Sequence, residues 1–211
     1  MYVAPRNGRW NLYLKPVGGG GEQLLTSDID APDDWSRDGR VIVYEASAGR
    51  NKLDLWWLPL DGDRKPVPYL QTEFNEYHGR LSPDGKWLAY ASDKTGRAEV
   101  YVQSFPTPGN EVLISANGAD QPAWRRDGKE LYYLTLDRKL MAVSLKPGAT
   151  FESGEPKVLF QTRAPATTFL LRNHYAPTAD GLKFLVETIP EDQSTVPLVM
   201  VLNWASGIGK P

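Results

Sequence analysis

The chain has 211 residues, 41% hydrophobic and 24% charged, which is enough for one domain, or at most two, with a sizeable core. Its 24 basic and 26 acidic residues give a net charge of −2, which argues against a nucleic-acid-binding surface. The absence of cysteine excludes disulfides, thiolate metal sites and cysteine nucleophiles. No apolar run approaches the roughly 20 residues of a membrane helix, so we expect no membrane partner.

The N-terminal residues show no basic segment followed by an apolar stretch, as a secretory signal peptide would. As written, the sequence therefore predicts a cytoplasmic protein. A piece of a longer exported chain would instead work in the periplasm.

The chain contains 19 Gly and 17 Pro, and these residues are spread evenly along it. Between them stand short apolar runs that carry many of the aromatic residues, which make up 11% of the sequence. Glycine and proline residues at this density leave little room for helices of ordinary length, so the sequence predicts an all-β protein.

The dipeptide Asp-Gly recurs every 43 to 53 residues, at 38–39, 84–85, 127–128 and 180–181. Each copy precedes an alternating apolar strand, so it marks a hairpin. In such a tight turn both central residues are expected to have positive φ.

Further strands are expected in chain order around each hairpin. The first unit, without its innermost strand, comprises Tyr2–Ala4, Trp10–Leu14 and Gln23–Thr26. The strands that follow Asp-Gly are 41–44, 87–90, 131–134 and 184–186. Third strands are expected at 53–58, 99–103, 140–145 and 198–202, and fourth strands at 67–70, 112–115 and 158–161.

Four antiparallel strands repeated at this period are typical of a β-propeller blade. We expect one propeller domain of five four-stranded blades, the first and last incomplete, at 1–27, 28–73, 74–117, 118–163 and 170–205. A closed five-bladed ring is favoured. The alternative is an open fragment of a six-bladed or larger propeller, whose exposed blade edges would favour self-association.

The segment Leu81–Ser92, with the sequence LSPDGKWLAYAS, resembles the TolB-type propeller repeat, and the resemblance continues through Gly96–Val102. Looser copies stand at Trp35–Gly39 and Gln121–Gly128, so the resemblance spans nearly the whole chain. It implies a module for binding or sensing, although related propellers carry peptidase domains or act as metal-dependent lactonases.

The C-terminal half resembles the propeller that follows bacterial Ser/Thr kinases and regulators, through Trp124–Met141 and Asn173–Trp204. The last blade departs from the repeat because Pro177 stands where the others have Trp or Leu.

Both histidines of the chain, His78 and His174, stand six residues before the Asp of an Asp-Gly pair. Equivalent positions in a ring project toward one axis, so the two imidazoles are candidate catalytic bases at the central channel. Alternatively, each imidazole packs on its own strand and has no catalytic role.

An acidic group precedes the same hairpins: Asp30, Asp33, Asp34, Glu76 and Asp120. Carboxylates gathered around one axis repel one another unless a hard cation such as Ca²⁺ binds between them. These residues are therefore candidate calcium ligands, with Asn173 as a neutral addition. The alternative is that each carboxylate binds neighbouring backbone.

These patterns support two functions of different class. The first is a binding or sensor module whose channel takes a protein partner or a small ligand. The second is a calcium-dependent hydrolase of lactones or esters, in which His78 or His174 activates water. Carbohydrate binding through channel aromatics is a third, weaker option.

Overall fold

A computed structural model describes residues 1–47, 52–146, 151–165, 173–188 and 198–201. All regular structure in these residues is β-strand, and the strands form five separate antiparallel sheets. Helix is absent from the described part of the chain, so none of it could cross a membrane as a helix.

The sheets follow one another in sequence, and each is built from consecutive strands. The first contains β1 (Tyr2–Arg6), β2 (Arg9–Leu14) and β3 (Gln23–Ser27). The second contains β4 (Ala31–Trp35), β5 (Val41–Ala46), β6 (Asp54–Pro59) and β7 (Val67–Leu70). The third contains β8 (Glu76–Leu81), β9 (Trp87–Ser92), β10 (Glu99–Ser104) and β11 (Val112–Leu113).

The fourth sheet has an additional short strand. It contains β12 (Ala119–Trp124), β13 (Glu130–Thr135), β14 (Lys139–Lys146), β15 (Glu152–Ser153) and β16 (Lys157–Gln161). The long strand β14 pairs with β15 near one end and with β16 near the other. The fifth sheet contains β17 (Tyr175–Pro177), β18 (Phe184–Glu187) and β19 (Leu198–Val201).

The hydrophobic core is divided into four clusters, one between each pair of successive sheets. Alternation along the second strand of a blade explains this arrangement, because successive side chains point to opposite faces. In β5, Ile42 and Tyr44 pack toward the first sheet, whereas Val43 between them packs toward the third. Each middle sheet is therefore buried on both faces, as in a propeller.

The Asp-Gly hairpins form at the four expected places, but their geometry differs from the expected tight turn. Only the glycines have positive φ, for example +75° at Gly39, and the preceding aspartates do not. The loop spans four residues, with the Gly39 amide donating to the Ser36 carbonyl at 2.9 Å. Because the loop is longer than a two-residue turn, only its glycine needs the left-handed region.

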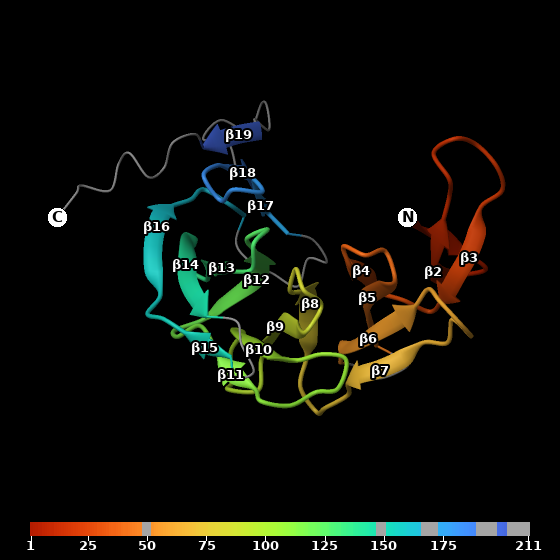
Figure 1. Cartoon of the computed structure of the whole chain (residues 1–211), viewed down its shortest axis with the longest axis horizontal. Coiled ribbons are helices and arrows are strands. Elements are labelled where there is room, and N and C mark those ends of the chain that lie inside the picture. The colour runs from red at the N-terminus through yellow and green to blue at the C-terminus, as the bar shows by residue number, and fades with distance from the viewer. Residues whose placement is uncertain (48–51, 147–150, 166–172, 189–197, 202–211) are drawn as a thin grey trace.

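The five sheets follow an open arc, as Figure 1 shows, with β1–β3 at one end and β17–β19 at the other. The all-β propeller architecture is thus confirmed, and it is that of an open or partial propeller. The closed ring favoured from the sequence is not formed by the described residues. The division into blades within one domain stays a prediction, and parts of the fifth range, 170–172, 189–197 and 202–205, lie outside the described residues.

Candidate functional site

The innermost strands β4, β8 and β12 each contain a β-bulge at equivalent positions of the repeat. In β8 the bulge comprises His78 and Gly79, and His78 has a φ of +55°. Gln121 occupies the same position in β12 with a φ of +54°. A bulge turns backbone groups away from the ladder, and in β8 it presents two amides to the neighbouring blade.

Side chains of the second sheet bind the amides that the β8 bulge re-aims. The Glu45 Oε1 atom accepts a hydrogen bond from the His78 amide at 2.7 Å, and Asp33 Oδ2 accepts one from the Gly79 amide at 2.9 Å. A Cβ at Gly79 would lie 2.8 Å from Val43 Cγ1, so the approach of the two blades requires glycine here. The predicted base His78 is thus held in a blade-to-blade contact and is only 4% exposed.

His174 occupies a corresponding contact between the fourth and fifth sheets and is 2% exposed. Its amide donates to Gln121 Oε1 at 2.7 Å, and its Nδ1 lies 3.0 Å from Gln121 Nε2. Its Nε2 lies 4.0 Å from Glu187 Oε2. A side-chain amide nitrogen can only donate, so this geometry assigns Nδ1 as acceptor and places the ring proton on Nε2, facing the carboxylate.

The five candidate calcium ligands do not assemble into one site. Among the described residues, no group of three His, Asp or Glu side chains is arranged to hold a metal ion. Asp30 accepts from the Ser47 amide at 2.5 Å, and Glu76 accepts from the Thr72 hydroxyl at 2.5 Å. Asp30 and Glu76 thus serve contacts of their own, and the calcium site stays a prediction without support from the described residues.

Asp33 and Glu45 form a buried acidic pair beside the β8 bulge. Burial raises the pKa of both carboxyl groups, and the charge of Glu45 contributes to the rise for Asp33. The guanidinium of Arg80 opposes this effect on both groups. The pair therefore favours a shared proton over two charges, which is compatible with both side chains accepting backbone hydrogen bonds.

Asp120 is isolated from other charged partners at the inner end of β12. It is 5% exposed, and its Oδ1 has no hydrogen-bond partner among the described residues. Burial raises the pKa of Asp120 to about 7, although its hydrogen bond with Gln121 acts in the opposite direction. Desolvation of an unpaired carboxylate is the physical cause.

A cavity of about 460 Å³ lies where the inner strands β4, β8, β12 and β17 come together, and we call it the axial cavity. Its wall includes Asp34, Arg80, Trp124 and Tyr175. The Asp34 carboxylate accepts from the Leu81 amide at 2.8 Å, and the Trp124 indole donates to the Arg80 carbonyl at 2.9 Å. These hydrogen bonds link successive blades and thereby shape the cavity.

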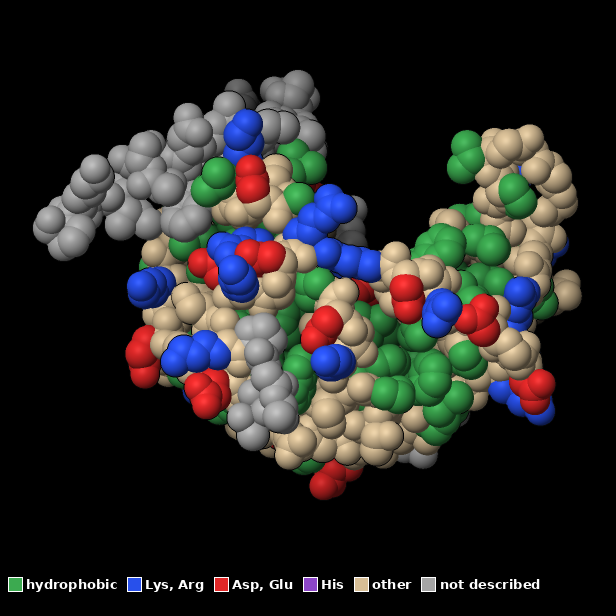
Figure 2. All heavy atoms as spheres, viewed as in Figure 1, with side chains coloured by type: hydrophobic (Ala, Val, Ile, Leu, Met, Phe, Trp, Pro, Cys, Tyr) green, Lys and Arg blue, Asp and Glu red, His purple; other side chains and the backbone are tan. Residues whose placement is uncertain are grey.

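The rim of the axial cavity carries exposed aromatic and basic side chains. Trp35 is 38% exposed, and Arg37 beside it donates from Nη1 to the Arg126 carbonyl at 2.6 Å. Figure 2 shows a hollow between the two ends of the arc with Lys and Arg side chains along it. The cavity thus combines an apolar surface with the charges of two arginines and of the Asp34 carboxylate.

The structure separates the two histidines from this cavity. Neither imidazole lines the axial cavity, although Asn173 and Tyr175 on either side of His174 do. Of the five acidic candidate ligands, only Asp34 is part of its wall. The catalytic role of the histidines stays a prediction without support from this geometry.

Sequence reasoning missed Glu45, Arg80 and Gln121, which hold the inner strands together. Gln121 stands at the same repeat position as the two histidines. A glutamine at this position was the available indication in the sequence that the position has a structural role. Glu45 gave no signal, because its partner is 33 residues away in another sheet.

Comparison with known proteins agrees with the propeller architecture. No family model matches the chain. It is 31% identical over 128 residues to the Tol-Pal system protein TolB of Anaeromyxobacter dehalogenans, over 58% of this chain and 29% of that protein.

Two solved structures show the same fold at lower identity. TolB from Acinetobacter baumannii superposes with a TM-score of 0.67 at 18% identity, covering 90% of this chain and 46% of that one. The β-propeller domain of the Trilobed protease from Pyrococcus furiosus, described as having an open velcro topology, gives a TM-score of 0.60 at 11% identity, with 98% and 67% covered. The chain thus spans less than half the length of either TolB. The repeats, the fold and these similarities together make the chain similar to TolB-like β-propeller proteins in sequence pattern and in fold.

Proposed function

We propose that this propeller is a protein-binding module whose contact surface is the axial cavity and its rim. The observation that carries the proposal is the half-exposed Trp35 next to Arg37 and Arg80 at the edge of a cavity of about 460 Å³. Tryptophan and arginine are the residue types that dominate binding energy at protein interfaces. Support for a binding role also comes from the TolB relatives.

The chemistry of the rim suggests the kind of segment it takes. Pro83 and Pro177 add apolar surface beside Trp35, and the guanidinium groups of Arg37 and Arg80 keep N–H donors that could bind a carboxylate of the partner. A peptide segment with an apolar side chain flanked by Asp or Glu matches this surface. The bound main chain would then lie across the ends of β4, β8 and β17.

Peptide selection tests the proposal, because it does not require the partner to be identified first. Random peptides displayed on phage are selected against the immobilised chain, and the enriched peptides are synthesised and titrated calorimetrically. We expect Trp35→Ala and Arg37→Ala each to weaken binding by about tenfold. Val158→Ala is the matched control, because Val158 is a 51% exposed residue on β16, which contributes no residue to the cavity. The site would be refuted if the enriched peptides bound the Trp35→Ala and Arg37→Ala variants as tightly as the wild type. It would also be refuted if the selection enriched no peptide.

The remaining expectations about this chain are still predictions. Hydrolysis of lactones or esters has no support from the arrangement of carboxylates and histidines, and nothing in the comparisons favours calcium. Self-association through open blade edges, and a location in the cytoplasm or in the periplasm, likewise stay predictions.

A further inference from the structure

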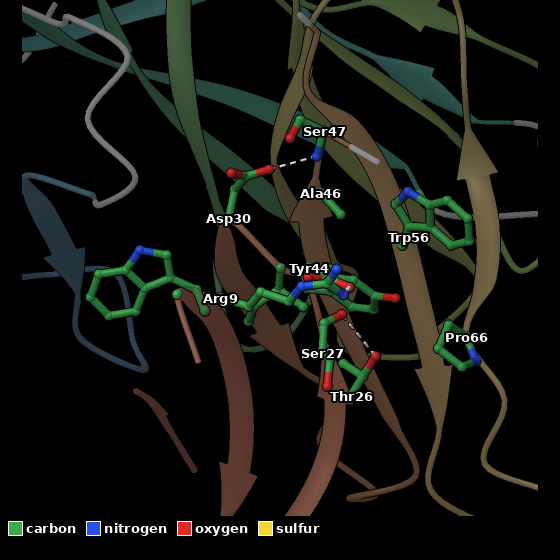
Figure 3. A pocket seen from close by; sticks show the side chains of 13 residues that line it. Arg9, Thr26, Ser27, Asp30, Tyr44, Ala46, Ser47, Trp56 and Pro66 are labelled. Carbon is green, nitrogen blue, oxygen red and sulfur yellow. Dashed lines mark hydrogen bonds and ion pairs between the residues drawn. The ribbon is translucent and has the colours of Figure 1, made fainter. Parts of the chain in front are cut away.

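A second cavity, of about 650 Å³, lies between the first and second sheets, and we call it the inter-blade cleft. Its wall is formed by β2 and β3 on one side and by β5 and β6 on the other. Figure 3 shows Trp56 and Pro66 along one side of this cleft, and Asp30 and Ser47 joined by a hydrogen bond near one end. It is separate from the axial cavity, since the two share no residue.

Aromatic rings form much of the apolar lining. The Trp10 side chain lines the cleft and is 53% exposed, whereas Tyr44 is only 3% exposed and lies within the interface between the sheets. Trp56 packs against the same core cluster. An exposed indole in a cleft that buried aromatic rings also line offers a flat apolar surface to a ring-shaped ligand.

Polar groups surround this aromatic lining. Arg9 Nη1 donates to Asp28 Oδ2 at 2.8 Å across the rim, which neutralises both charges. Asp30 accepts from the Ser47 amide through Oδ2 only, which leaves Oδ1 to accept a further hydrogen bond. Ser27 and Ser47 add hydroxyl groups that both donate and accept.

The charges restrict the chemical class of ligand. Among the described residues that line the cleft, Arg9 is the one cation and already binds Asp28, so an anion would meet Asp30 without an unpaired cation from this lining. A purely apolar ligand would bury the Oδ1 atom of Asp30 without a hydrogen-bond donor, which costs free energy. A neutral molecule with an apolar face and several hydroxyl groups satisfies both the rings and the carboxylate.

We propose that the inter-blade cleft binds a neutral saccharide, with the apolar face of a pyranose ring on Trp10 and hydroxyl groups donating to Asp30. The volume falls within the range of about 300–1,000 Å³ found for small-molecule sites. Selectivity for hydroxylated rings follows from the combination of acceptors and hydroxyl groups around one aromatic surface. This site does not depend on the protein-binding function assigned to the axial cavity.

The test is a titration with neutral sugars, followed by tryptophan fluorescence and by calorimetry. The probes are glucose, galactose, N-acetylglucosamine, maltose and cellobiose at millimolar concentrations. At least one of them is expected to bind and to change the fluorescence. Trp10→Ala should weaken that binding by about tenfold or more, and Asp30→Asn by about tenfold. Asn keeps an acceptor for the Ser47 amide, so this variant removes the charge with little change to the cleft.

Two controls make the outcome decisive. Leu24→Ala changes a 52% exposed residue of β3 outside the cleft and should leave the affinity unchanged. The melting temperature of each variant reports folding, and Trp10 is exposed enough for its removal to be tolerated. Lack of binding by every sugar, binding unaffected by Trp10→Ala, or tetramethylammonium binding in place of the sugars would each overturn the proposal.

Discussion

Replacing Asp120 by Asn should change how the stability of the propeller depends on pH. In the folded chain the pKa of Asp120 is about 7, raised from 3.8 by burial in the fourth sheet, where Oδ1 has no partner among the described residues. A raised pKa means that the folded state favours the protonated carboxyl group. Its contribution is therefore fully present below about pH 3.8, declines as pH rises and is lost above about pH 7.

The magnitude follows from the size of this pKa change. At about 1.4 kcal/mol per pH unit, ionisation of Asp120 costs the folded state about 4 kcal/mol by pH 8, as an upper limit. We expect Asp120→Asn to gain up to this amount relative to wild type between pH 4 and pH 8. Urea denaturation at pH values across this interval, followed by tryptophan fluorescence, measures the difference and cancels any effect that is independent of pH.

Asp61→Asn serves as the isosteric control, since the Asp61 side chain is 75% exposed. Its stability should follow the wild-type curve at every pH. The reasoning would be refuted if the Asp120→Asn and wild-type curves ran parallel, because Asp120 would then titrate alike in the folded and unfolded chain.

Two further predictions concern the turns and the acidic residues. Gly181→Ala should destabilise the chain by more than Gly8→Ala, because both positions have left-handed φ near +70° but only a Cβ at Gly181 would collide with the Tyr132 hydroxyl and Arg125. Urea midpoints measure the difference, and equal losses of about 1 kcal/mol in both variants would show that the close packing around Gly181 contributes nothing. Adding millimolar CaCl₂ or EDTA should leave the melting temperature unchanged, since the predicted ligands do not converge. A calcium-dependent rise would show that the carboxylates meet in solution after all.

The strands of the repeat could be predicted because their signals are local. Alternating apolar residues and an Asp-Gly pair act within about ten residues, so 41–44 and 87–90 were placed correctly from sequence. The turn type was harder to predict from sequence, because it depends on the length of the loop. The hydrogen bond from the Ser36 amide to the Val41 carbonyl closes the loop and sets that length. The register of the two strands that the turn joins determines which carbonyl accepts from the Ser36 amide.

The candidate site was only partly predictable. The repeat position of His78 and His174 correctly indicated equivalent places in the fold, but equivalence did not make them accessible: both amides are bound by the preceding blade. Spacing along the chain reports which strand a residue belongs to. It does not report which side chain of another blade fills the space beside it.

The sequence alone therefore determined the all-β character, the repeat and the alternation that buries both faces of the middle sheets, since each depends on short-range geometry. Only the tertiary structure decided that the sheets form an open arc, that Glu45 and Gln121 join the blades through bulged inner strands, and that the exposed Trp35 borders a cavity. These features depend on contacts between residues separated by 33 or more positions. Such contacts arise when whole sheets pack against one another, and no local pattern specifies them.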